Sequence, residues 1–126
     1  MRINDSETLA ELQALYPQYE AALVQNDVEK LTQMFWSSNH TVRMGLAENL
    51  YGVEEIAAFR KGRPTANLAR TVHRLDIITF GRDFGSITLE FERTQDGKLV
   101  RGRQSQAWVR LPEGWRIVAA HVSLLP

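Results

Sequence analysis

The sequence predicts an α+β domain in which a curved antiparallel or mixed sheet wraps around an N-terminal layer of helices to form a cone. Helical apolar spacing dominates the first half of the chain, as far as Lys61, and strand-like runs dominate the remainder, from Leu68 to Leu125. Helices followed by four long consecutive strands are typical of the α+β class. With 126 residues and no linker-like or repetitive segment, the chain is predicted to form one domain over residues 1–126.

Three helices are predicted in the first half. Asn4 and Asp5 are good N-cap residues, and the following apolar stripe has spacings of three and four: Leu9, Leu12, Tyr16, Tyr19 and Leu23. This stripe predicts a helix of about 20 residues, in which Pro17 is expected to cause a kink or a local break. Asn26 and Asp27 are expected to cap a second, short helix. A strand near 41–44 and an extended piece near 49–51 precede a third helix over 53–61.

Four long strands are predicted in the second half, over residues 68–80, 84–94, 99–111 and 115–125. In the second of them Ile87, Leu89 and Phe91 alternate with polar residues, so that one face is apolar. Asp96-Gly97 is a strong signal for a two-residue hairpin. We expect this meander to curve around the helices and to enclose a concavity of the kind that ligands occupy.

The composition excludes several classes of function. Fifteen basic and fifteen acidic residues cancel, which argues against nucleic-acid binding. The absence of cysteine excludes disulfides, thiolate metal sites and cysteine nucleophiles, and it fits a reducing compartment. The sequence has no run of 18 apolar residues and no apolar core near its N-terminus, so we expect neither membrane binding nor a signal peptide, and a cytoplasmic location.

Polar side chains interrupt the last two strands and predict a sheet that lines a polar pocket. Gln104 and Gln106 share one strand face and offer amide donors and acceptors that suit an amide or urea-like ligand. The alternative is a face that meets solvent or another subunit. His121 on the last strand is a further candidate for substrate binding, although a strand histidine is also a common structural hydrogen-bonding residue.

Tyr19 and Arg43 are the candidates for chemistry. Tyr19 lies on the buried helical stripe, where its phenol either packs in the core or points into the cone as a proton donor. Arg43 lies in the first short strand and is either solvated or directed inward; no carboxylate is its immediate neighbour in sequence, so an inward guanidinium is expected to bind a ligand carboxylate. Trp36 is expected either to line the pocket or to pack in the core.

Other charged residues carry weaker signals. Arg60 and Arg63 are interpreted as a solvated helix end, with an anion site at the mouth of the cone as the alternative. Glu90 and Glu92 share a strand face that is expected to be exposed. The three histidines, His40, His73 and His121, lack ligand spacing and a neighbouring carboxylate cluster, so neither a metal nor another cofactor is predicted.

The order of the predicted elements and the ending from Trp115 to Ser123 resemble the nuclear transport factor two superfamily, the fold of ketosteroid isomerase and SnoaL. Within it, the chain resembles the AtzH-like subgroup, which includes the oxalurate-catabolism protein HpxZ. The segments that carry this resemblance lie at residues 19–24, 35–36, 40–43, 48–52, 81–83 and 102–106. The resemblance covers essentially the whole chain and implies the cone fold.

The resemblance also implies a function. Tyr19 and Arg43 would be the catalytic pair, in bacterial catabolism of ureide or s-triazine nitrogen beside amidase-type enzymes. The implied substrate is a small carboxylated urea, such as a dicarboxyurea converted to allophanate with loss of carbon dioxide. Two alternatives stay open: a non-catalytic ligand-binding or accessory subunit of an amidase complex, and a ketosteroid-isomerase-like enzyme with Asp76 as its base. We further expect a homodimer packed through the outer sheet face.

Overall fold

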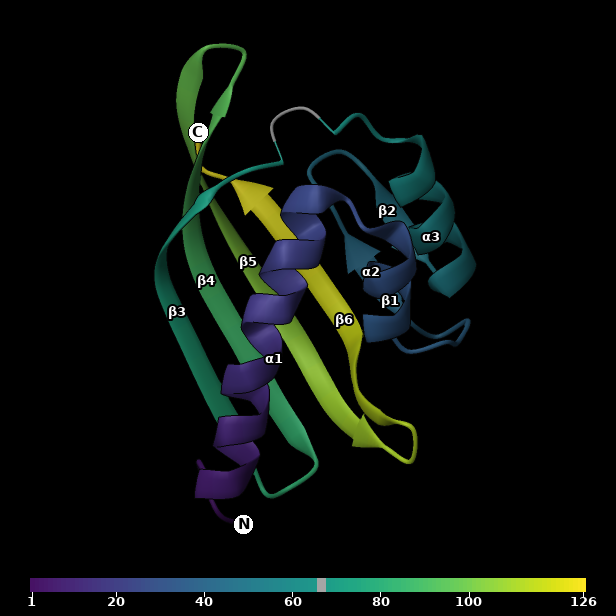
Figure 1. Ribbon diagram of the computed structural model, residues 1–126, viewed down its shortest axis with the longest axis vertical. Coiled ribbons are helices and arrows are strands. Elements are labelled where there is room, and N and C mark those ends of the chain that lie inside the picture. The colour runs from purple at the N-terminus through teal and green to yellow at the C-terminus, as the bar shows by residue number, and fades with distance from the viewer. Residues whose placement is uncertain (66–67) are drawn as a thin grey trace.

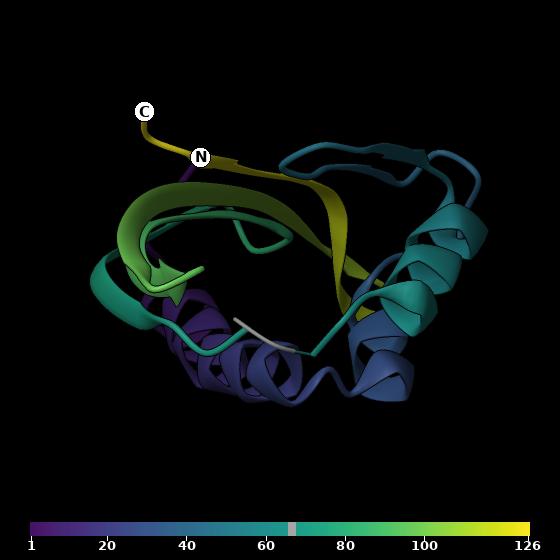
Figure 2. The same cartoon turned by 90° about the horizontal axis from the view of Figure 1, so that it is seen from above.

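The computed structural model describes residues 1–65 and 68–126 and confirms the α+β cone. A six-stranded sheet in the order β2-β1-β6-β5-β4-β3 curves around the helices, as Figures 1 and 2 show. β1 runs parallel to β6 and the other neighbours are antiparallel, so the sheet is mixed. No helix in the described residues is long and apolar enough to cross a bilayer.

The first helix, α1 (Ser6–Gln25), lies in the hollow of the sheet (Figure 2). The side chain of Asp5 caps it by accepting a hydrogen bond from the backbone N–H of Thr8 at 3.3 Å. Its predicted stripe is buried from Leu12 to Leu23. The break expected at Pro17 is absent, since α1 is continuous through this residue. The proline ring lies on the exposed face of the helix, where water can solvate the backbone carbonyl that loses its helical partner.

The remaining elements follow the predicted order with small shifts in their bounds. α2 (Val28–Met34) is capped by Asp27, and α3 (Val53–Gly62) begins after Gly52. The strands are β1 (Val42–Met44), β2 (Asn49–Tyr51), β3 (Thr71–Phe80), β4 (Phe84–Gln95), β5 (Lys98–Leu111) and β6 (Gly114–Leu124). Asp96 and Gly97 both have positive φ, 53° and 77°, which confirms the tight hairpin between β4 and β5.

Side-chain alternation on β4 and β5 decides which residues face the helices. Ile87, Leu89 and Phe91 on β4 are buried, as are Gln104 and Gln106 on β5. Gly102 pairs with Phe91 across the two strands, and a Cβ at this position would overlap the phenylalanine ring. Gly102 therefore leaves room for Phe91 to lie inside the cone.

A bulge in β6 reverses the alternation of that strand. The pairing with β5 shifts between Ala107 and Trp108, so that Val118 is the extra residue on β6. Trp115 and Ile117 are buried before the bulge, whereas Ala120 is buried after it and His121 is exposed. Simple alternation from Trp115 would have placed His121 on the inner face, so the bulge explains why the position expected for this side chain is wrong.

Candidate functional site

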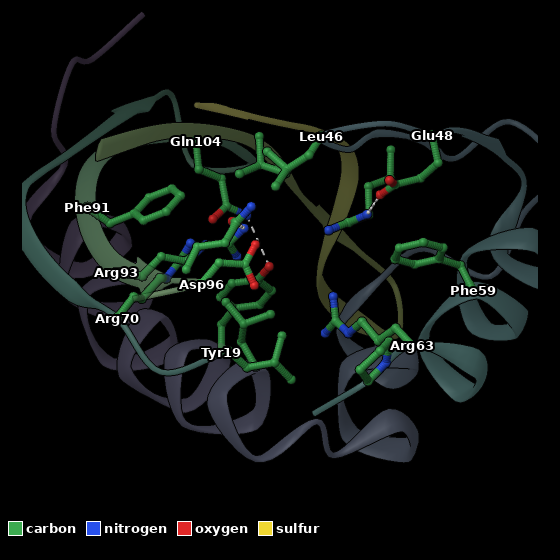
Figure 3. A pocket seen from close by; sticks show the side chains of 16 residues that line it. Tyr19, Leu46, Glu48, Phe59, Arg63, Arg70, Phe91, Arg93, Asp96 and Gln104 are labelled. Atoms are coloured by element: carbon green, nitrogen blue, oxygen red, sulfur yellow. Dashed lines mark hydrogen bonds and ion pairs between the residues drawn. The ribbon is translucent and has the colours of Figure 1, made fainter. Parts of the chain in front are cut away.

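The concave side of the sheet and the helices enclose a cavity of about 360 Å³. Its wall includes Tyr19 from α1, Arg43 from β1, Phe59 from α3, Phe91 from β4 and Gln104 from β5. In Figure 3, Arg70, Phe91 and Arg93 lie on one side of the cavity and Phe59 and Arg63 on the other. The volume is at the lower end of the range for small-molecule sites, so the cavity fits a ligand of few atoms.

Tyr19 and Gln104 form the buried centre of this wall. The amide Nε2 of Gln104 donates a hydrogen bond to the Tyr19 hydroxyl at 3.0 Å. The hydroxyl donates to no protein acceptor among the hydrogen bonds of the described residues, so its own proton is available to a ligand. The other amide atom of Gln104, Oε1, is buried without a partner there. One group is therefore a free donor and the other a free acceptor, as a urea requires.

The electrostatic surroundings of Tyr19 favour the loss of its proton. Burial alone raises the pKa of the phenol, but the positive charges of Arg60, Arg43 and Arg70 and the bond from Gln104 together lower the pKa below its ordinary value of 10.0. Each of these groups stabilises a phenolate more than a phenol. A phenol with a lowered pKa is a stronger general acid than free tyrosine.

Arg43 is buried, and it has a protein carboxylate as partner. Its Nη1 donates to Glu48 Oε2 at 3.0 Å, and its guanidinium lies 5.6 Å from the centre of the Phe59 ring. The Glu48 carboxylate lies against Gly45, where any Cβ would overlap it. No carboxylate is the immediate neighbour of Arg43 in sequence, but the turn between β1 and β2 returns Glu48 to it, so a ligand is not the first counter-charge of this guanidinium.

Arg70 enters the cavity wall in a second ion pair. Its Nε and Nη2 donate to the two carboxylate oxygens of Glu20, each at 2.9 Å, and its guanidinium lies 4.5 Å from the centre of the Phe91 ring. The Tyr16 hydroxyl donates to the same carboxylate at 2.6 Å. Burial raises the pKa of Glu20, but the bonds from Arg70 and Tyr16 outweigh it and hold the pKa below its usual value.

Arg60 and Arg63 are not a solvated helix end. Arg60 is fully buried, with its guanidinium 4.6 Å from the centre of the Phe35 ring, and none of its side-chain nitrogens has a partner among the described residues. Arg63 lines the cavity and donates from Nε to Asn26 Oδ1 at 3.0 Å. The helix-dipole interpretation failed because α3 packs on α2 and directs this end inward.

The cavity therefore carries an excess of positive charge. Among the described residues, four arginines line it, Arg43, Arg63, Arg70 and Arg93, against the carboxylates of Glu48 and Asp96. The carboxylate of Glu20 neutralises Arg70 from outside the lining. Such a cavity favours anionic ligands, because buried guanidinium groups need a counter-charge.

The structure brings together some of the sequence candidates and separates others. Tyr19, Arg43 and Gln104 line the same cavity. Gln106 is buried beside it, with Oε1 accepting from Trp108 Nε1 at 2.9 Å, and is not part of the lining. His121 is exposed on the outer face and Trp36 stacks on His40, so neither contributes to the wall.

Sequence reasoning missed Glu48, Arg70 and Arg93. Arg93 follows Phe91 by two residues and continues the inward face of β4, so strand alternation alone was enough to find it. Glu48 and Arg70 lie outside any periodic pattern. Asp76, the candidate base of the isomerase alternative, is exposed and paired with Arg74 at 2.8 Å, away from the cavity lining. In residues 1–65 and 68–126 no group of three or more His, Asp or Glu side chains is arranged to hold a metal.

The family model of AtzH-like proteins matches residues 1–126. The chain belongs to the AtzH-like family. This result confirms the resemblance stated from the sequence. None of the curated proteins compared with the chain matches it.

Two solved structures are similar in both sequence and shape. A Pectobacterium atrosepticum protein described as having unknown function is 48% identical over 98% of this chain and 95% of its own, with a TM-score of 0.91. A Burkholderia xenovorans protein with a cystatin-like fold is 43% identical over 100% and 99%, with a TM-score of 0.89. A Salmonella enterica nuclear transport factor 2-like protein is 24% identical over 96% and 93%, with a TM-score of 0.76, and supports the fold alone.

Proposed function

We propose that this AtzH-like protein is a metal-free enzyme that removes one terminal carboxylate from a small carboxylated urea. The model substrate is 1,3-dicarboxyurea and the product is allophanate, as a step in bacterial catabolism of ureide or s-triazine nitrogen. The observation that carries the proposal is a buried phenol, Tyr19, with a free proton in an arginine-rich cavity beside the amide of Gln104.

The reaction breaks the bond between a terminal carboxylate carbon and the urea nitrogen. The electron pair of that bond stays on nitrogen, the carboxylate leaves as carbon dioxide, and nitrogen accepts the proton of Tyr19. A proton from solvent then restores the phenol. One dianion and one proton thus give the allophanate monoanion and carbon dioxide. In this step Tyr19 is the general acid, and the neighbouring guanidinium groups stabilise its phenolate.

The remaining lining residues have roles in binding. The departing carboxylate loses its negative charge as it becomes carbon dioxide. A guanidinium paired with it would stabilise the substrate more than the transition state and so slow the reaction. We therefore assign Arg43 to the carboxylate that the product retains. Gln104 Oε1, buried without a protein partner, accepts from a urea N–H. Phe59 and Phe91 form the sides of the cavity (Figure 3), with the guanidinium groups of Arg43 and Arg70 5.6 Å and 4.5 Å from the centres of their respective rings.

The test compares the purified protein with the spontaneous reaction. Dicarboxyurea is generated in situ, and release of carbon dioxide and formation of allophanate are followed with and without protein. The proposal predicts a clear acceleration that saturates with substrate. A rate equal to the spontaneous one, with binding of dicarboxylates retained, would instead support the non-catalytic ligand-binding or accessory subunit of an amidase complex.

A further inference from the structure

Arg63 holds a guanidinium nitrogen in the cavity wall that no described protein group pairs. It is the C-cap residue that follows α3, and its Nε already donates a hydrogen bond to Asn26 Oδ1. Its Nη2 is buried and has no hydrogen-bond partner among the residues that the structure describes. A buried, charged donor without an acceptor is costly, so this nitrogen is expected to meet an acceptor supplied by a ligand.

Two arginines of the cavity wall differ from Arg63 in this respect, whereas Arg93, whose Nη2 donates to Gln95 Oε1 at 2.7 Å, also keeps a buried Nε without a partner among the described residues. Arg43 is paired with Glu48 and Arg70 with Glu20. Arg60 has no carboxylate partner in the described residues either, and although burial lowers its pKa to about 10 it remains charged at neutral pH. Uncompensated positive charge therefore lies at the end of α3, where Arg60 and Arg63 are found, and at Arg93 on β4.

Asn26 fixes the direction of Arg63. It ends α1 in the left-handed conformation, with φ 48° and ψ 47°, and its backbone N–H caps that helix. Its Nδ2 donates to the carbonyl of Arg60 at 3.1 Å while its Oδ1 accepts from Arg63 Nε at 3.0 Å. One side-chain amide thus ties the ends of α1 and α3 together and points Arg63 at the cavity that Tyr19, also on α1, lines.

We propose that Arg63 is the principal carboxylate-binding residue of the cavity and that Asn26 is its positioning residue. The ligand carboxylate would accept a hydrogen bond from Arg63 Nη2, while Asn26 Oδ1 accepts one from Nε of the same guanidinium. The identity of the ligand as a carboxylated urea rests on the proposed function. The binding role of Arg63 does not, because any small dicarboxylate that enters the cavity tests it. The charge of the ligand is then recognised chiefly at α3, while Arg43 contributes alongside its own ion pair.

The experiment measures binding of malonate, an unreactive dicarboxylate, by calorimetry, with neutral urea for comparison. Arg63→Met should raise the Kd of malonate about tenfold or more, the usual weight of a charge-assisted hydrogen bond. Arg103→Met, on the exposed outer face of β5, is the matched control and should leave the Kd unchanged. Arg63→Lys keeps the charge without the planar fork and should give an intermediate Kd, which preserves the test if Arg63→Met fails to fold.

Asn26→Gly tests the positioning role, because glycine adopts the left-handed conformation but removes both side-chain bonds. It should weaken malonate binding, and the double variant Asn26→Gly/Arg63→Met should bind no more weakly than Arg63→Met alone. A merely structural role would give additive losses. Wild-type affinity in Arg63→Met, or no dicarboxylate binding by the wild type, would overturn the inference. Binding that depends on Arg63 without any turnover would refute the proposed function only.

Discussion

Replacing Tyr19 with phenylalanine removes one hydroxyl and keeps the ring in the core. The chemical consequence follows from the free proton of this phenol: without it, turnover should fall by about a hundredfold or more, the usual contribution of a positioned acid. The structural consequence follows from the bond at 3.0 Å from Gln104, whose Nε2 would lose its buried acceptor. We expect the variant to be less stable by about 1–3 kcal/mol, so it still folds.

The assay for this variant follows carbon dioxide or allophanate, with urea unfolding as a parallel measure of stability. Tyr51→Phe is the matched control, since Tyr51 on β2 is 58% exposed and its hydroxyl should affect neither measurement. The pH profile adds an independent test. The lowered pKa of Tyr19 means that wild-type kcat should decline with rising pH before pH 10, as the phenol loses its proton. The residual activity of the variant should lack this decline.

Unchanged turnover in Tyr19→Phe would refute the acid role of Tyr19 while leaving the binding role of the cavity intact. The same conclusion would follow if the variant kept the alkaline decline of the wild type. An equal loss in Tyr51→Phe would show that the effect is not specific to the cavity.

Three further predictions concern the ion pairs and the outer face. Arg43→Lys keeps a charge but not the planar fork, so kcat/KM should fall about tenfold or more; an unchanged value would contradict a binding role for Arg43. The pKa of Glu20 lies below its usual 4.5 in the folded protein, so the unfolded chain binds more protons than the folded one. The Glu20–Arg70 pair should therefore stabilise the fold fully above pH 4.5 and less as the pH falls through the lowered pKa. Glu20→Gln should remove this pH dependence in urea unfolding. Sedimentation at micromolar concentration should show a dimer packed through the outer sheet face, and a purely monomeric species would contradict this prediction.

The fold was predictable from local patterns. The spacing of Leu12, Tyr16, Tyr19 and Leu23 specifies one buried helix face, and the alternation of Ile87, Leu89 and Phe91 specifies one buried sheet face. Asp96-Gly97 fixes the register of the hairpin that joins β4 to β5. These signals work because side-chain direction repeats with a fixed period in a helix or strand, so the buried face can be predicted from the spacing of apolar residues within one segment.

The sequence by itself placed Tyr19 on the buried stripe of a helix, but it left open whether Arg43 and Gln104 face inward, and the structure brings all three into one cavity lining. The sequence did not determine which charges compensate one another, because that depends on contacts between distant segments. Arg63 meets Asn26 across 37 residues, and Arg70 meets Glu20 across 50. The bulge at Val118 changes the phase of β6, and with it the side on which His121 lies. Periodicity gives the face that a side chain occupies, whereas only the tertiary structure decides its partners, because electrostatic and hydrogen-bond energies depend on distance in space.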